Sequence, residues 1–273
     1  MRSLHSIEPI KKKYETNGSK PFLILADDFE YYVCKYPRNA GDHKLINEFL
    51  GQRFALEWGI KVPEMVSIQI EREHVPEQML GDGLNYLNLE KPIIGFKLIA
   101  DAVEFMDHFA SGIEKSELRK YDKSAFLLVA LFDCWLSNDD RNHNNTNLFI
   151  SFENNEYKPI AFDHEAIFNT SNLSRGIFEQ SYHDSLLYSQ LYHRLLPNSE
   201  KSREIIKNIC ASLHNKVLTC GRKLDDIVEE IPDEWLGRKE EFKGRLSQHL
   251  FNEEWLNSVE NTYTTYASLT LKP

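Results

Sequence analysis

The spacing of hydrophobic and polar residues changes near residue 100. Before that point, short apolar runs rich in β-branched and aromatic residues alternate with turns, and they predict strands over residues 22–25, 31–36, 62–70 and 93–99. The longer segment 44–58 predicts a helix, with Asp42 as its N-cap and Gly59 at its end. Its expected core-facing stripe consists of Leu45, Phe49, Gln52 and Leu56.

After residue 100 the pattern becomes mainly helical. Residues 122–137 are apolar on nearly all sides and predict a buried helix. Two short strands are expected at 148–152 and 158–163, and amphipathic helices over about 180–265 with breaks at Pro197 and Pro232. Residues 1–16 read as a polar lead-in or a short edge strand, and 71–90 as a loop or an extended insertion. This order predicts an α+β fold of two lobes. Residues 1–99 would form a β-rich N-lobe around one main helix, and residues 100–273 a mostly helical C-lobe.

Composition narrows the class of protein. The chain has 273 residues, of which 41% are hydrophobic, so it can bury a core. Its 42 acidic residues outnumber 32 basic ones, and the net charge of −10 argues against direct binding to nucleic acid or an anionic membrane. No apolar run approaches the length of a membrane span. Four scattered cysteines without zinc-type spacing indicate a reducing compartment, and we expect a cytoplasmic protein.

The most informative segment is the loop 138–147, which contains no apolar side chain. Alone it is typical of a solvated turn, since Asn and Asp bond locally to the backbone. Asp163, however, stands at the end of the hairpin that follows. A helix, a polar loop, a hairpin and then a carboxylate is the order of a phosphoryl-transfer site, in which a loop Asp orients the acceptor hydroxyl. An Asn at the end of the loop and the later Asp would bind Mg²⁺.

Two segments, FDCWLSNDDRNHNNTNLFI and PIAFDHEAIF, resemble the catalytic and metal-binding motifs of the HipA-like kinases. These enzymes are distant relatives of the protein-kinase and phosphoinositide-kinase folds. The resemblance implies ATP and Mg²⁺ as cofactors, Asp140 as the catalytic residue, and Asn147 and Asp163 as metal ligands. Two alternatives stay open. Asp139 directly precedes Asp140, and Asn145 stands five residues after Asp140, the spacing of phosphoinositide-type loops.

The N-terminal half contains the other residues that a kinase needs. Lys35 lies in an apolar strand, where burying an ammonium group requires a charge partner, and Glu48 follows thirteen residues later on the predicted helix. We expect Lys35 to hold the α- and β-phosphates and Glu48 to orient it. The turn before the first hairpin strand, with Gly18 and Ser19, would cover the phosphates. The hinge that bonds adenine would include Lys97 and Leu98.

The favoured function is therefore ATP- and Mg²⁺-dependent transfer of the γ-phosphoryl group to a hydroxyl. The resemblance implies a Ser or Thr of a protein, including Ser19 or Thr16 of the chain itself, and a regulatory partner protein as in some relatives. One alternative is a small-molecule or lipid kinase, and another is a pseudokinase scaffold that binds nucleotide without turnover. A metal-dependent hydrolase is a third, disfavoured because no His-rich motif such as HExxH is present.

Overall fold

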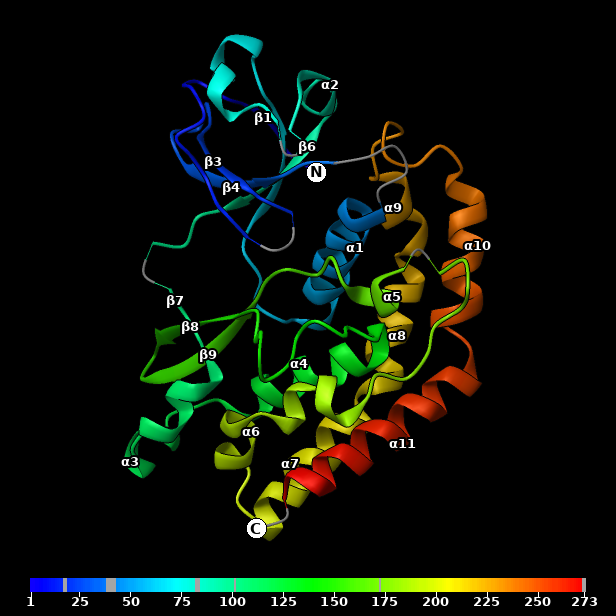
Figure 1. Ribbon diagram of the computed structural model, residues 1–273. Helices are drawn as coiled ribbons and strands as arrows, with labels where there is room; N and C mark the ends of the chain where they lie inside the picture. The colour runs from blue at the N-terminus through cyan, green and yellow to red at the C-terminus, as the bar shows by residue number, and fades with distance from the viewer. Residues whose placement is uncertain (17–18, 38–42, 82–83, 101, 172, 272–273) are drawn as a thin grey trace.

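The computed structural model describes residues 1–273 except 17–18, 38–42, 82–83, 101, 172 and 272–273. A twisted sheet forms the upper part of the molecule and helices form the lower part, with a small second sheet at the side (Figure 1). The sheet-rich half precedes the helical half in the sequence. This arrangement is the predicted α+β class, while the boundary placed at residues 99–100 stays a prediction.

The large sheet has six strands in the order β1-β5-β6-β4-β3-β2. Their bounds are Ser3–His5 (β1), Lys12–Lys13 (β2), Phe22–Leu25 (β3), Tyr31–Lys35 (β4), Met65–Gln69 (β5) and Ile93–Lys97 (β6). β4 is a central strand, antiparallel to β3 and β6, whereas β1 joins the far edge parallel to β5. Of the alternatives for residues 1–16, short strands are therefore correct.

The stretch 71–90, predicted as a loop, holds short helical turns. They are the 3₁₀ turns Arg72–His74 and Glu77–Met79 and the single-turn helix α2, Tyr86–Leu89. Asn85 caps α2 by accepting a hydrogen bond from the Asn88 N–H at 3.0 Å, and the side-chain oxygen of Asn88 accepts one from the Asn85 N–H at 3.1 Å. Reciprocal capping of this kind satisfies donors that a one-turn helix cannot bond internally. The polar composition of this stretch did not distinguish a loop from short helices, because the residues that cap helices are themselves polar.

Helix α1 spans His43–Trp58 and lies between the sheet and the helical half (Figure 1). It is buried on nearly all sides, so the predicted single stripe is too narrow. Leu45, Phe49 and Gln52 are buried as expected, but Leu56 is half exposed and was wrongly placed in the core. The predicted N-cap Asp42 lies outside the described residues.

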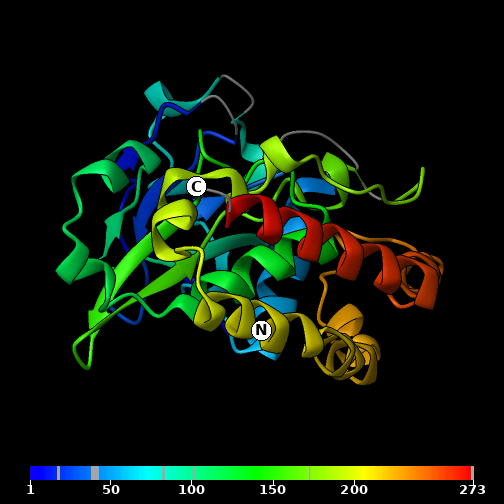
Figure 2. The same cartoon turned by 90° about the horizontal axis from the view of Figure 1, so that it is seen from below.

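The second half consists of the sheet β7-β8-β9 and the remaining helices. The strands are Val103–Glu104 (β7), Leu148–Glu153 (β8) and Glu156–Ala161 (β9). The helices are Lys115–Leu118 (α3), Lys123–Leu136 (α4), Ile167–Thr170 (α5), Gln190–Leu195 (α6), Glu200–Ala211 (α7), Leu213–Arg222 (α8), Leu224–Glu229 (α9), Lys239–Leu250 (α10) and Glu253–Thr270 (α11), with 3₁₀ turns at Asp107–Gly112, Tyr182–Asp184 and Leu186–Tyr188. Seen from below, α7 and α11 cover the underside (Figure 2). Within the described ranges, no helix is long and apolar enough to cross a membrane.

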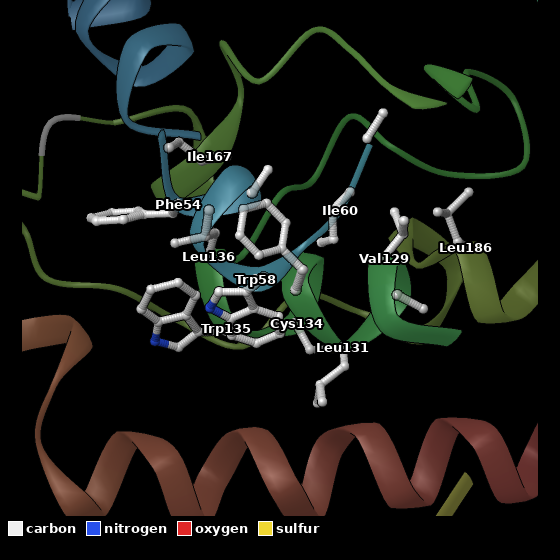
Figure 3. Packing of buried hydrophobic residues seen from close by; sticks show 14 of the residues in the cluster. Phe54, Trp58, Ile60, Val129, Leu131, Cys134, Trp135, Leu136, Ile167 and Leu186 are labelled. Carbon is white, nitrogen blue, oxygen red and sulfur yellow. The ribbon is translucent and has the colours of Figure 1, made fainter. Parts of the chain in front are cut away.

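Aromatic side chains of α1 pack against aromatic side chains of α4 in the helical half. Trp58 stacks on Trp135 of α4 with ring centroids 5.2 Å apart, and Phe132 meets Trp58 edge-on at 5.2 Å. Phe54 also packs against Trp135, with tilted rings whose centroids lie 5.3 Å apart (Figure 3). The indole N–H of Trp135 donates to the Leu250 carbonyl at 3.0 Å, which satisfies the buried polar end of the ring. One core therefore joins the sheet-side helix to the element that leads into the polar loop.

The end of helix α4 fixes where the polar loop 138–147 begins. Its N-cap is Asp122, whose carboxylate accepts from Ala125 N–H at 3.1 Å. The helix ends at Ser137, which takes the left-handed conformation with φ +49° and is fully buried. A left-handed residue turns the chain out of the helical path. The polar residues that follow are thereby directed toward the region between the sheet and the helices.

Candidate active site

Asparagines shape the polar loop by bonding to its own backbone. The Asn142 side chain donates to the Asp139 carbonyl at 3.0 Å and accepts from Asn144 N–H at 2.9 Å. The Asn142 N–H donates to the Asn145 carbonyl at 2.9 Å. Such side-chain and backbone bonds are the physical reason that Asn suits tight turns. These bonds explain why the loop is rich in asparagine. They give it a defined conformation rather than that of a solvated segment.

Arg141 lies buried beneath the loop, and its hydrogen bonds form a brace that holds the loop in place. Its guanidinium donates to the carboxylate of Asp133 on α4 and, at 2.8 Å, to the carbonyl of Phe162. Arg141 and Asp133 are both fully buried. Burial raises the pKa of Asp133 to about 6, against the opposing effect of Arg141. The brace links the loop to the residue before Asp163, so the two halves of the predicted site are positioned together.

The two adjacent carboxylates of the loop face different partners. Asp140 accepts from the side-chain amides of Asn145 at 2.8 Å and Asn147 at 3.3 Å. Asp139 instead accepts from Asn169, at 3.2 and 3.3 Å. Burial and the nearby Asp163 charge raise the pKa of Asp140, while both amides lower it. Asp140 therefore shares an electrostatic environment with Asp163, and Asp139 belongs to the contact with α5.

Lys35 lies at the centre of a group of carboxylates. Its ammonium donates to Glu48 and lies 2.9 Å from Asp163 Oδ1, an ion pair rather than a well-directed hydrogen bond. Glu165 Oε2 lies 3.6 Å from the same nitrogen. Burial by itself would lower the pKa of Lys35, but Asp163, Glu48 and Glu165 raise it above its ordinary value. Lys35 therefore stays charged, which a phosphate-binding group requires.

The carboxylates respond to that ammonium in different ways. Burial and the like charges of Asp163 and Glu165 raise the pKa of Glu48, although Lys35 opposes the change. Burial would likewise raise the pKa of Asp163, but Lys35 outweighs it and holds that pKa below its ordinary value. Asp163 is thus ionised near neutral pH, which is a condition for binding a hard cation.

The segment after β9 is attached to α1 by its backbone. His164 N–H donates to Glu48 Oε2 at 2.9 Å, so Glu48 bonds Lys35 with one oxygen and this segment with the other. Asn47 donates from its side chain to the Glu165 carbonyl at 3.1 Å. Asp163 has a left-handed backbone, with φ +57°. These bonds fix a backbone conformation that is uncommon for an Asp and direct its side chain at Lys35.

The residues present fit a divalent cation. The carboxylate oxygens of Glu48, Asp163 and Glu165 lie within 4.8 Å of one another. These three carboxyl groups lie close to two ammonium groups, those of Lys35 and Lys44. An oxygen-rich site of this kind suits Mg²⁺, which accepts few protein ligands and keeps the rest of its shell for water and phosphate. Asp163 and Asn147 remain the predicted ligands.

The structure brings together five predicted residues, and it shows no contact of Ser19, Lys97 or Leu98 with them among the described residues. Lys35, Glu48 and Asp163 are in contact, and Asp140 and Asn147 are in contact beside them. Gly18 lies outside the described residues, and Ser19 is half-buried before β3. The N–H of Lys97 donates to Glu64, and that of Leu98 to Tyr31, at 2.8 Å each. Neither N–H is free to donate to adenine in this conformation, so a hinge at these two residues finds no support and stays a prediction.

Other residues of the site were not identified from the sequence. Asp133 lies inside the apolar helix α4, where a charged residue requires a partner. Arg141, eight residues later, is that partner and was the available signal. Glu165 follows Asp163 by two residues, and that spacing was the only local signal for a further carboxylate. Asn169 gave no signal, because its partner Asp139 is thirty residues away in the sequence.

Comparisons with known proteins concern the family and the fold of the chain. A family model described as HipA-like kinase matches residues 7–263. The solved structure of the Helicobacter pylori proinflammatory kinase CtkA is similar with a TM-score of 0.54 and 14% identity, covering 96% of this chain and 97% of that one. Hydra Fam20, solved with sugar, has a TM-score of 0.55 and 12% identity over 98% of this chain and 88% of that one. At these identities the likeness shows the fold alone, and it confirms the predicted kinase-like fold.

A further solved structure contains HipA of Shewanella oneidensis with HipB and operator DNA. It has a TM-score of 0.47 and 11% identity, covering 92% of this chain and 68% of that one. A search of the curated proteins found no match.

Proposed function

The chain belongs to the HipA-like kinase family, and from this premise we propose that it transfers the γ-phosphoryl group of ATP, with Mg²⁺, to a Ser or Thr hydroxyl of a protein. The observation that carries the proposal is the contact of Lys35 with both Glu48 and Asp163. Lys35 comes from the sheet, Glu48 from α1 and Asp163 from the end of β9. A scaffold protein would have no need to keep a buried lysine among carboxylates, since burying charge is costly.

Each residue has a distinct part in this mechanism. Lys35 holds the α- and β-phosphates, and Glu48 fixes its direction. Asp140 accepts a hydrogen bond from the acceptor hydroxyl and aligns its oxygen with the γ-phosphorus. Asp163 and Asn147 hold Mg²⁺, which when bound neutralises charge on the phosphate oxygens. Positioning and charge compensation account for most of the acceleration in such reactions, so few covalent roles are required.

Two further parts of the proposal concern the acceptor and a partner. Thr16 is exposed and Ser19 is half-buried, both in the segment before β3, so this chain offers candidate acceptors of its own. Mass spectrometry after incubation with Mg²⁺ and ATP would show phosphate on either residue. The predicted regulatory partner, suggested by the HipB-bound relative, would be sought by co-purification.

Incubation with γ-labelled ATP, Mg²⁺ and a cell lysate tests the proposed function. We expect label on protein, and the loss of nearly all of it in Asp140→Ala and Asp163→Ala, which should remain folded. Full activity in either variant would show that the site is assigned wrongly. Label on small molecules would favour the small-molecule or lipid kinase, no label a scaffold, and release of free phosphate alone a hydrolase. Omitting Mg²⁺ or replacing it with Mn²⁺ defines the metal requirement.

A further inference from the structure

Glu165 is placed to act on two cations at once. One of its carboxylate oxygens lies 3.0 Å from the ammonium of Lys44, and the other lies 3.6 Å from that of Lys35. The Glu165 side chain is only 11% exposed, whereas that of Lys44 is 38% exposed. A carboxylate that is nearly buried is costly unless cations compensate it. The two lysines supply that compensation, and Glu165 in turn holds them side by side.

The position of Glu165 is fixed from the backbone as well as from the side chain. Its carbonyl accepts from Asn47, which is fully buried on α1. Lys44 and Asn47 are three residues apart on this helix and so lie on the same face. Glu165 is therefore held by one face of α1 at its carbonyl and at its carboxylate.

Binding of a metal ion would change what Lys35 contacts. In this structure Asp163 lies 2.9 Å from Lys35, but as a ligand of Mg²⁺ it would share its charge with the cation. Glu48 alone would then remain as a close partner on the α1 side, while its second oxygen is committed to His164 N–H. Glu165 is the additional carboxylate that can keep Lys35 in place, because it is already within ion-pair distance.

We propose that Glu165 is a positioning residue, which keeps Lys35 and Lys44 together as a pair of phosphate-binding cations when Asp163 turns to the metal ion. The inference rests on the proposed function. It adds Lys44, on the first turn of α1, to the groups that face the nucleotide phosphates. Glu165 itself does not contact the nucleotide in this scheme, since its negative charge would repel the phosphates.

The variants Glu165→Gln and Glu165→Asp separate charge from shape. The Gln side chain keeps the length and loses the charge, whereas the Asp side chain keeps the charge and is shorter. If Glu165 positions the lysines by its charge, kcat falls about tenfold or more in Glu165→Gln and less in Glu165→Asp. KM for ATP should not rise in Glu165→Gln, because a negative charge near the phosphates has been removed. A merely structural role predicts the reverse order, with Gln the better replacement.

Lys44→Met tests the second cation, with Glu153→Gln as the matched control. Glu153 pairs with Lys61 on the surface, so its loss removes an ion pair far from the site. Calorimetric titration with Mg²⁺·ATP should show binding weakened about threefold or more in Lys44→Met and unchanged in the control. Wild-type affinity in Lys44→Met, or a Glu165→Gln variant within about twofold of wild-type kcat, would overturn the inference. A wild-type protein without transfer would refute the proposed function instead, and the titration would still decide on Lys44.

Discussion

Arg141 and Asp133 form a buried ion pair beneath the candidate catalytic loop. Arg141 is the residue that follows Asp140, and Asp133 lies on α4, so the pair holds the loop to the helix from which it emerges. A second bond from Arg141 reaches the Phe162 carbonyl, directly before Asp163. Asp140 and Asp163 therefore take their relative position from one arginine that is inaccessible to solvent.

Asp133→Asn should destabilise the protein strongly at pH 7.5. The guanidinium of Arg141 would be left buried without its counter-charge, which costs about 3–5 kcal/mol. Urea unfolding followed by fluorescence of the buried tryptophans measures the change. Glu153→Gln is the control, since its ion pair is exposed and worth about 0–1 kcal/mol. A loss below about 1 kcal/mol in Asp133→Asn would contradict the role of the brace.

Gly51→Ala should destabilise the protein although Ala is the better helix former. A Cβ at Gly51 would collide with the Cβ of His164 and lie 2.6 Å from its Cγ. Forcing α1 away from this segment costs about 1–3 kcal/mol, more than the ~1 kcal/mol that Ala gains over Gly in a helix. Kinase activity should fall as well, because Glu48 and Asn47 bond to the same segment.

Gly244→Ala provides the matched comparison for this substitution. Gly244 lies inside α10, and a Cβ there meets nothing within 4 Å among the described residues. The substitution should stabilise by about 0.5–1 kcal/mol through helix propensity alone. Equal effects of the two substitutions in urea unfolding would show that the contact with His164 is unimportant.

His164 should make stability fall on mild acidification. It is fully buried, and burial, followed by the charges of Arg141 and Lys35, holds its pKa well below 6.5. Below about pH 6.5 the unfolded chain binds a proton that the folded protein excludes, so stability is lost as the pH falls. The loss reaches about 1.4 kcal/mol per pH unit for one group.

His164→Leu removes this titrating group and keeps an apolar side chain in its place. Both ring nitrogens of His164 lack a hydrogen-bond partner within the described part of the chain, so the replacement sacrifices no such bond there. Between pH 6.5 and 5 the unfolding free energy of the wild type should fall relative to that of the variant, because only the wild type carries this group. Parallel curves for the two proteins would refute a neutral, buried His164.

Asn145 and Asn147 should differ in their effect on the metal requirement. Both donate to Asp140, but only Asn147 is nearly buried, with a left-handed backbone at φ +46°. If Asn147 is the ligand, Asn147→Ala raises the Mg²⁺ concentration for half-maximal activity about tenfold or more. Asn145→Ala should chiefly lower kcat, by loosening Asp140. Asn144→Ala, at an exposed position of the same loop, is the control, and the opposite ranking would assign the metal to Asn145.

Local chemistry explains why much of the fold could be predicted. The strands around residues 22–35, the helix ending at Trp58 and the buried helix α4 are marked by local apolar runs and turn or cap residues, and all three are present. Leu56 was misplaced because a periodic stripe cannot show that a helix is covered on several sides. For a similar reason, the sequence did not show which buried polar residues pair with each other. The match of Arg141 to Asp133 and of Asn169 to Asp139 depends on which elements pack together.

The amino-acid order alone predicts the types and order of the candidate reactive groups: a strand lysine, a helix glutamate, an Asn-rich loop and a carboxylate after a hairpin. Order along the chain is sufficient for that prediction, because the chemistry of phosphoryl transfer restricts which residues can serve. Packing of the chain places Asp140 rather than Asp139 near Asp163, and it brings Glu165 to Lys35 and Lys44. Charges act through distances in space, and contacts between residues more than a hundred positions apart, such as Lys35 with Asp163, form only when the core brings β4, α1 and β9 together.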